Sequence, residues 1–315
     1  MNKFKKAYEA LVNLNNLPIY IAGHLKPDQD SVGSCLALAE FLKSKGKEVY
    51  VLIEEKDKDI LSWKGDYSLV AFGKKHERYN FIALDLNEKK RLGAFEKDFD
   101  QAEYKINIDH HQDNKYEADF TLSISGISST CEIVFEVIKN DGKQVFTKDV
   151  CDYLYAGMMN DTNCFTRRLS SKTMTIAQKV INYGADYANI IKKTFSERTM
   201  YWFKALAKLV NEMKFDEFHY VVVDKELEEF KNLSHNNIVK QIAEELRKIE
   251  GIDVFLVLIK NGNTIVAKVM SNISSIADKL AAEFGGGGHK KEAGFTVCDM
   301  TVDEIISKAK EFLKK

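Results

Sequence analysis

The chain has 315 residues, of which 45% are apolar and 30% are charged, and its formal net charge is −1. This length allows two domains with separate cores. The composition is that of a soluble globular protein, and no apolar run approaches the roughly 20 residues that cross a membrane. Proteins that bind long DNA or RNA usually carry a basic excess. Because that excess is missing here, we expect no long duplex as a partner.

The cysteines and the N-terminus indicate the cellular compartment. The five cysteines are scattered along the chain and form no C-x-x-C motif. That pattern is typical of reduced thiols in an intracellular protein. The first residues, Met1-Asn2-Lys3-Phe4, lead into an amphipathic stretch and not into a signal peptide. We therefore predict a cytoplasmic protein with no membrane association.

The first half of the chain predicts an α/β fold with a parallel sheet. A helix is expected over residues 3–16, and another over residues 31–45 that stops at Gly46. Short apolar segments that are rich in β-branched residues predict the strands at 18–23, 48–53, 68–72, 81–85 and 105–109. Such strands between helices favour a parallel sheet that is covered on both faces.

Histidines and aspartates gather where these strands end. His24, Asp28 and Asp30 follow the first strand, Asp85 ends a later one, and Asp109-His110-His111 ends another. Polar groups that do chemistry collect beyond the carboxyl ends of parallel strands. Each cluster alone could be a helix cap or a solvated turn. Their joint occurrence at strand ends favours one shared site.

Asp161 adds a further carboxylate, because it closes the largely apolar helical run 153–160. Imidazole and carboxylate without thiolate favour manganese or magnesium, with iron or cobalt as alternatives. Four aspartates, at positions 28, 30, 85 and 161, would balance the charge of two divalent cations. Paired cations of this kind activate water and stabilise the oxygens of a phosphate ester. We expect Asp109 to orient the adjacent histidines from outside the ligand set.

The second half predicts a helical region and then a smaller α/β domain. Residues 128–213 look mostly helical, and strands are expected at 219–223, 253–259, 264–270 and 292–297. We place a metal-binding domain at 1–190, a helical linker at 191–214 and a substrate-binding domain at 215–315.

A glycine run follows the amphipathic helix that is expected at 276–284. The run is Gly285-Gly286-Gly287-Gly288, and His289 comes directly after it. One glycine would suffice as a helix C-cap. Four in succession leave the backbone N–H groups bare, so they could close on an anion.

Together these motifs resemble the DHH phosphoesterase family, which is named for the triplet Asp109-His110-His111. A first motif is complete as His24, Pro27, Asp28, Asp30, Ser31, Gly33 and Ser34, and Asp85 with Arg91-Leu92-Gly93 forms the second. Another motif runs from Gly157 to Thr162, with Phe165 after it. Gly286 to His289 followed by Ala293-Gly294 resembles the signature of the DHHA-type C-terminal domain. The family that the chain resembles includes RecJ-like proteins, and the resemblance spans nearly the whole chain.

The resemblance implies a role for each of these residues. It implies His24 and Asp28 on one manganese, Asp30, His110 and Asp161 on the other, and Asp85 as a bridge. It implies His111 and Asp109 as the catalytic pair, with His111 facing the scissile phosphate. Gly286, Gly287, Gly288 and His289 would hold a substrate phosphate.

Within the family, size and domain plan look most like the bacterial oligoribonucleases of the NrnA type. That likeness implies a manganese-dependent nuclease that hydrolyses short RNA oligonucleotides and nucleoside 3′,5′-bisphosphates. Hydrolysis of linear or cyclic signalling dinucleotides is the alternative, and a non-catalytic nucleotide sensor is a further one. Mg²⁺, Co²⁺ and Fe²⁺ remain alternatives to Mn²⁺, and a homodimer is left open.

One departure from the family pattern concerns the C-terminal domain. Relatives carry an arginine in a pattern like S-x-R-S before the last helix, whereas this chain has Met270-Ser271-Asn272-Ile273 there. A guanidinium holds phosphate through two parallel bonds that asparagine cannot imitate. We therefore expect substrate range or affinity to differ from that of relatives.

Overall fold

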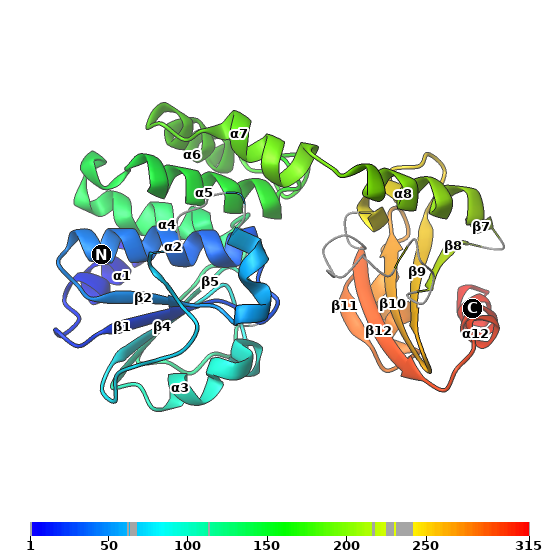
Figure 1. Ribbon diagram of the computed structural model, residues 1–315, viewed down its shortest axis with the longest axis horizontal. Helices are drawn as coiled ribbons and strands as arrows, with labels where there is room; N and C mark the ends of the chain where they lie inside the picture. The colour runs from blue at the N-terminus through cyan, green and yellow to red at the C-terminus, as the bar shows by residue number, and fades with distance from the viewer. Residues whose placement is uncertain are drawn as a thin grey trace. The chain divides into compact units, whose positions relative to one another are not determined.

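The computed structural model describes residues 2–61, 63, 68–112, 114–215, 218–224, 230 and 242–314. The chain forms two compact units, of which the first ends at Glu197 and the second begins at Arg198 (Figure 1). None of the helices within the described ranges is long and apolar enough to cross a membrane.

The first unit is built on a six-stranded sheet in the order β3-β2-β1-β4-β5-β6. Every pairing in this sheet is parallel. The strands are β1 (Ile19–Ala22), β2 (Val49–Leu52), β3 (Val70–Ala71), β4 (Asn80–Leu84), β5 (Tyr104–Asp109) and β6 (Phe120–Ser123). The parallel sheet that the sequence predicts is therefore confirmed.

Helices cover both faces of this sheet, as Figure 1 shows. The described helices are α1 (Lys3–Val12), α2 (Gln29–Ser44), α3 (Glu96–Asp100), α4 (Thr130–Ile138), α5 (Lys148–Asp161), α6 (Ser171–Asn182) and α7 (Tyr187–Ile191), with short helical turns η1 (Glu55–Leu61), η2 (Lys89–Phe95), η3 (Lys139–Asp141), η4 (Lys143–Val145) and η5 (Lys192–Ser196). The larger core joins the sheet to α1, α2, α4 and α5, and includes Leu11, Leu38, Ile82 and Leu154. A smaller core of Tyr20, Phe81, Phe99 and their neighbours lies under η2 and α3.

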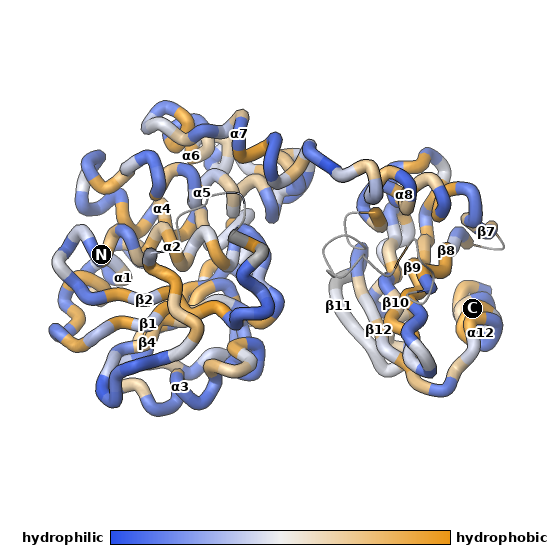
Figure 2. The backbone as a smooth tube through the Cα atoms, viewed as in Figure 1, coloured by the Kyte–Doolittle hydropathy of each residue, from blue (hydrophilic) through white to orange (hydrophobic). Residues whose placement is uncertain are grey.

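Hydropathy along the chain matches this layering. Figure 2 shows hydrophobic segments in the central strands and hydrophilic segments on the outer turns. Strands β1 and β4 are buried along their whole length, which explains why they read as continuous apolar runs without alternation.

The register of the central strands brings their carboxyl ends to one edge. Ala22 of β1 lies opposite Ala83 of β4, and Leu84 lies opposite Ile108 of β5. The segments after β1, β4 and β5 therefore emerge side by side. These segments carry His24, Asp85 and the Asp109-His110-His111 triplet.

The second unit contains a mixed six-stranded sheet in the order β11-β12-β10-β9-β8-β7. Its strands are β7 (Lys214–Phe215), β8 (His219–Asp224), β9 (Val254–Asn261), β10 (Thr264–Ser271), β11 (Gly287–His289) and β12 (Glu292–Cys298). β8 and β9 pair in parallel, and the other pairings are antiparallel. Helices α11 (Ala277–Ala282) and α12 (Val302–Leu313) pack on one face, and α8 (Met200–Glu212) packs on the other.

Helix α8 belongs to the core of the second unit. Its buried residues Trp202, Ala205 and Leu209 pack with Val221 of β8 and Phe230. Residues 200–212 are thus held by the second unit and are not a free connection. The domain limits at 190 and 214 stay a prediction.

Candidate metal centre

The helix α2 begins with a cap that also belongs to the site. Asp28 is the N-cap residue, and its Oδ1 accepts from the backbone N–H groups of Asp30 and Ser31, both at 3.1 Å. This is the ordinary way in which aspartate satisfies the free donors of a helix start. The cap fixes one carboxylate oxygen and leaves Oδ2 outside both of these bonds.

Asp30 belongs to the first turn of α2, and its carboxylate contacts the start of a second helix, α4. Its Oδ2 accepts from Thr130 N at 2.7 Å and its Oδ1 from Cys131 N at 2.9 Å. The side chain is fully buried, and the positive end of the α4 dipole favours a carboxylate there. Two helices distant in sequence are thereby joined at one carboxyl group.

Asp85 lies at the centre of the cluster. It follows β4 with a φ of 63°, a left-handed conformation that is uncommon for residues other than glycine and is often found at functional sites. Its Oδ1 accepts from the hydroxyl of Thr130 at 3.0 Å. The unusual backbone turns this side chain into the space beyond the sheet edge.

The two histidines His24 and His110 are oriented in the same way. His24 Nδ1 donates to the carbonyl oxygen of Leu25 at 2.9 Å, and His110 Nδ1 donates to that of Ile127 at 3.1 Å. A donor bond at Nδ1 leaves the lone pair on Nε2 free to bind a cation. His24 Nε2 lies 3.5 Å from Asp85 Oδ2, and His110 Nε2 lies 3.3 Å from Asp161 Oδ2.

His111 has a carboxylate partner instead of a carbonyl. Its Nδ1 donates to Asp109 Oδ1 at 2.7 Å, and Asn114 donates to the other oxygen, Asp109 Oδ2, at 2.7 Å. Burial alone would raise the pKa of Asp109. The bonds from His111 and Asn114 outweigh burial and hold that pKa below its usual value. Asp109 is therefore a buried anion that orients His111.

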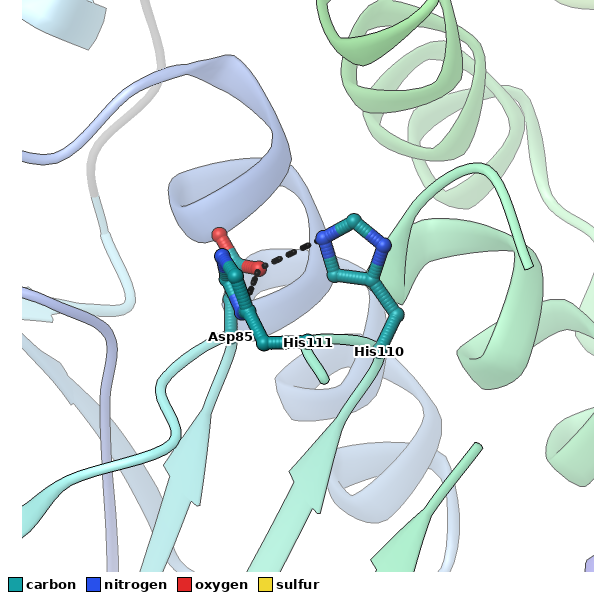
Figure 3. A group of neighbouring side chains, drawn as sticks. All are labelled: Asp85, His110 and His111. Atoms are coloured by element: carbon teal, nitrogen blue, oxygen red, sulfur yellow. Dashed lines mark ion pairs between the residues drawn. The ribbon is translucent and has the colours of Figure 1, made fainter. Parts of the chain in front are cut away.

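All of the expected ligand residues come together in three overlapping groups. The groups are His24 with Asp28 and Asp85, Asp30 with His110 and Asp161, and Asp85 with His110 and His111; within each, the ligand atoms lie within 4.8 Å of one another. Figure 3 shows His110 and His111 converging on Asp85. Asp85 and His110 each belong to two of these groups. The assignment of these residues as ligands stays a prediction.

Without cations the cluster is electrostatically unfavourable. Burial and then the charge of Asp85 raise the pKa of Asp30 to about 7. Burial and then the charge of Asp30 raise the pKa of Asp161 well above its usual value. Burial lowers the pKa of His24 and His110, but the surrounding carboxylates outweigh it and raise both to about 9. These shifts mean that protons take up the positive charge that metal ions would otherwise supply.

Close packing of α2, α4 and α5 sets the position of Asp30. A Cβ on Gly157 of α5 would lie 2.2 Å from Cys131 Sγ and 2.8 Å from Asp30 Oδ1. Only glycine leaves room for the three helices at this point.

Sequence reasoning did not identify the groups that support the ligands. Thr130 and Cys131 hold Asp30 and Asp85, Asn114 holds Asp109, and the Ile127 carbonyl orients His110. The capping pattern of Ser129, which accepts from Glu132 N at 3.1 Å, marks the start of α4 and could have pointed to Thr130.

The glycine run of the second unit has a structural explanation. Gly285 N and Gly286 N donate to the carbonyls of Ala282 and Ala281, so they close the end of α11. A Cβ on Gly286 or Gly288 would lie 2.2 Å from Gly294 O or 2.6 Å from Ala293 Cα of β12. At Gly287, nothing lies within 4 Å of an added Cβ. The expected nest is therefore an edge strand, β11, and its contact with substrate phosphate stays a prediction. The side chain of His289 lies outside what the structure describes.

Asn272 lies in the stretch where the family arginine is missing. Its Oδ1 accepts from Arg247 Nε at 3.3 Å and Nη2 at 3.2 Å, and its Nδ2 donates to the carbonyls of Arg247 and Ile252. Asn272 is thus committed to internal bonds, and a guanidinium from elsewhere in the chain lies beside it.

Both units match families of known proteins. Residues 18–158 match the DHH family, N-terminal domain, and residues 218–315 match the DHHA1 domain. The chain is 25% identical over 311 residues to the bifunctional oligoribonuclease and PAP phosphatase NrnA of Thermus thermophilus, a match that covers 95% of this chain and 90% of that protein. It is 27% identical over 316 residues to the cyclic-di-AMP phosphodiesterase GdpP of Geobacillus thermodenitrificans, covering 93% of this chain but 46% of that protein.

Two solved structures share the fold. An exopolyphosphatase-related protein from Bacteroides fragilis superposes with a TM-score of 0.87 at 23% identity, covering 99% of this chain and 95% of that one. RecJ from Thermus thermophilus in complex with Mn²⁺ gives a TM-score of 0.58 at 12% identity, covering 100% of this chain and 55% of that one. The α/β architecture of both units is therefore that of known RecJ-like proteins.

Proposed function

Since this chain belongs to the DHH family of phosphoesterases, we propose that it is a two-metal hydrolase of short oligoribonucleotides that also dephosphorylates nucleoside 3′,5′-bisphosphates. The family makes it a hydrolase, and the substrate class and the metal are our proposal. The relative named as a bifunctional oligoribonuclease and PAP phosphatase, which aligns along nearly the whole chain, supports the substrate class.

One observation carries the metal part of the proposal. His24 and His110 each donate from Nδ1 to a backbone carbonyl, so their Nε2 atoms face carboxylate oxygens at 3.3–3.5 Å. In the metal-free protein, protonated imidazoles with a pKa of about 9 satisfy these contacts, and a metal ion would replace the Nε2 proton of each histidine. The imidazole and oxygen donors, with no thiolate among them, suit Mn²⁺ or Mg²⁺, and RecJ from Thermus thermophilus has been solved with each of these ions.

In this proposal, His24, Asp28 and Asp85 hold one cation, and Asp30, His110 and Asp161 share Asp85 to hold the other. Bound there, the pair would supply activation of water and stabilisation of charge on a phosphate ester. His111 would then hold or donate a proton at the reacting oxygens. Asp109 would keep the His111 ring in place with Nδ1 protonated, so that Nε2 can face the substrate.

The test is turnover of di- to pentaribonucleotides and of 3′-phosphoadenosine 5′-phosphate by the purified protein with Mn²⁺. We expect turnover that is abolished by EDTA and by Asp85→Asn. The matched control is Asp119→Asn, because Asp119 is an exposed carboxylate of the same unit that accepts from Lys105 N at the amino end of β5. Equal activity in Asp85→Asn and wild type would contradict the proposal. Tight nucleotide binding without turnover would favour a sensor.

A second candidate substrate is a signalling dinucleotide. The cyclic-di-AMP phosphodiesterase GdpP matches along 93% of this chain and so favours that class, although the chain spans 46% of GdpP. Turnover of cyclic-di-AMP and its linear product beside an oligoribonucleotide series separates the two. A kcat/KM higher for the cyclic dinucleotide than for any oligoribonucleotide would replace our first choice.

A further inference from the structure

A cavity of the first unit opens beside the candidate metal centre. It is partly open to solvent. His24 lines it from the segment after β1, Ser31 from the start of α2, Glu54 and Asp57 from the segment after β2, and Leu92 and Phe95 from η2. His24 is shared with the metal centre, where its Nε2 lies 3.5 Å from Asp85 Oδ2. A group attached to a phosphate at that centre would therefore reach the cavity.

The walls of the cavity are mainly apolar. Val51, Ile53, Leu92 and Phe95 line it and are buried in the cores of the unit. Walls of this kind suit the flat faces of a planar ring and offer little to a sugar, whose hydroxyl groups need polar partners.

Two carboxylates break this apolar lining. Glu54 and Asp57 are the acidic side chains among the described lining residues. Asp57 Oδ2 is buried and has no hydrogen-bond partner within the described part of the chain. Glu54 Oε2 pairs with the exposed Lys56 Nζ at 2.6 Å. A buried acceptor without a donor is unfavourable, so Asp57 is ready to accept from a ligand.

The ligand must therefore be planar, joined to a phosphate, and able to donate hydrogen bonds to carboxylates. Guanine presents adjacent N1–H and N2–H donors on its Watson–Crick edge. Adenine and cytosine present one amino group beside an acceptor nitrogen, and uracil presents one N–H between two carbonyls. Carboxylates accept and cannot donate when ionised, so they favour guanine and repel uracil.

We propose that this cavity binds the guanine base of the nucleotide whose phosphate lies at the His24–Asp85 centre, with Asp57 and Glu54 accepting from its N–H groups. This inference rests on the proposed function and adds a base preference to it. A site that hydrogen-bonds a ligand discriminates strongly against an analogue without the donor.

The experiment compares pGpG, pApA, pCpC and pUpU, because a dinucleotide with two identical bases gives the same answer for either direction of cleavage. We expect kcat/KM to be highest for pGpG and lowest for pUpU, with a ratio of about tenfold or more. Asp57→Asn and Glu54→Gln should reduce that ratio. Both should hydrolyse bis-p-nitrophenyl phosphate, which has no base, as the wild type does. Glu55→Gln, an exposed neighbour outside the cavity, should keep the ratio.

Binding of GMP and UMP with Mn²⁺, measured by calorimetry, gives a second readout that needs no turnover. Tighter binding of GMP that is lost in Asp57→Asn supports the cavity even if no dinucleotide is cleaved, a result that would contradict only the proposed function. Equal rates for the four dinucleotides, together with equal affinities for GMP and UMP, would overturn the inference. A loss in Asp57→Asn that is uniform over the four bases would overturn it too.

Discussion

At the scale of single residues, two members of the candidate metal centre are held by backbone groups from a later segment of the chain, whereas His24 and Asp28 are held by their own neighbours. Asp30 accepts from Thr130 N and Cys131 N, and His110 donates to the Ile127 carbonyl. The meeting of these histidines and aspartates could be predicted from the sequence, because histidine and aspartate at strand ends are rare without a use. The backbone N–H and carbonyl groups that support them could not, because such groups leave no signature in residue types.

Metal binding and stability should both depend on pH through these residues. The pKa values of His24 and His110 lie at about 9 in the metal-free protein, above the ordinary 6.5. Their contribution to stability is full below pH 6.5 and is lost as pH rises to 9. The pKa of Asp30 is raised from 3.8 to about 7, so Asp30 takes up a proton on folding. Its contribution to stability is therefore lost as pH rises from 3.8 to 7.

We therefore expect the Tm of the metal-free protein to fall between pH 6 and 9. Saturating Mn²⁺ should remove most of that fall, because metal replaces the protons. Mn²⁺ affinity should rise over the same range, and calorimetry in buffers of different ionisation enthalpy should show proton release. A metal-free Tm that rises with pH would contradict the cluster as described.

Asp109 offers a test of positioning, because it contacts His111 and not the ligand groups. Asp109→Asn should lower kcat by about 10–100-fold, the usual effect of losing such a support. KM should change little, and Mn²⁺ affinity should stay near that of the wild type. A matched loss in Asp119→Asn would show that the effect is not specific. Unchanged kcat in Asp109→Asn would exclude the orienting role of this carboxylate.

At the scale of elements, burial decided which strands of the first sheet could be predicted from the sequence. The apolar runs of β1, β4 and β5 were predicted within a residue or two of their bounds. β6 (Phe120–Ser123) was missed, because only Leu122 of its four residues is buried, whereas all four residues of β1 are. The glycine run was expected as a loop, but part of it forms the strand β11. Positions 286 and 288 require glycine because an added Cβ there would clash with β12.

The crossing of α2, α4 and α5 predicts that the site is sensitive to a single methyl group. Gly157→Ala would place a Cβ 2.2 Å from Cys131 Sγ. Overpacking of this kind costs about 1–3 kcal/mol, so we expect a lower Tm and weaker Mn²⁺ binding as Asp30 moves. Gly73→Ala is the control, because nothing lies within 4 Å of its added Cβ. Adding Cys131→Ala to Gly157→Ala should restore part of the Tm; no restoration would place the strain elsewhere.

At the scale of the whole molecule, the chain forms two units, and the candidate metal centre lies in the first of them. All of the predicted metal ligands belong to the first unit, which ends at Glu197. The second unit has its own cores, which include α8. The sequence indicates this division through the restart of strand–helix alternation, but it does not show which unit α8 joins, because an amphipathic helix can pack on either.

This division predicts an unequal thermal response to metal. Mn²⁺ at about 100 times its Kd should stabilise the folded first unit by about 2.7 kcal/mol. Scanning calorimetry should show two transitions, of which Mn²⁺ raises only one. Asp85→Asn should abolish that rise. A single transition that Mn²⁺ raises as a whole would show instead that the two units unfold as one.

The bonds from the two imidazoles to the carbonyls of Leu25 and Ile127 have a consequence for evolution. Every amino acid brings an equivalent carbonyl, so residue identity at these two places is free to drift without disturbing the rings. Chain length around them has no such freedom. Inserting or deleting a residue in either loop would move the acceptor by several ångströms. Natural variants should therefore differ there in residue identity and not in loop length.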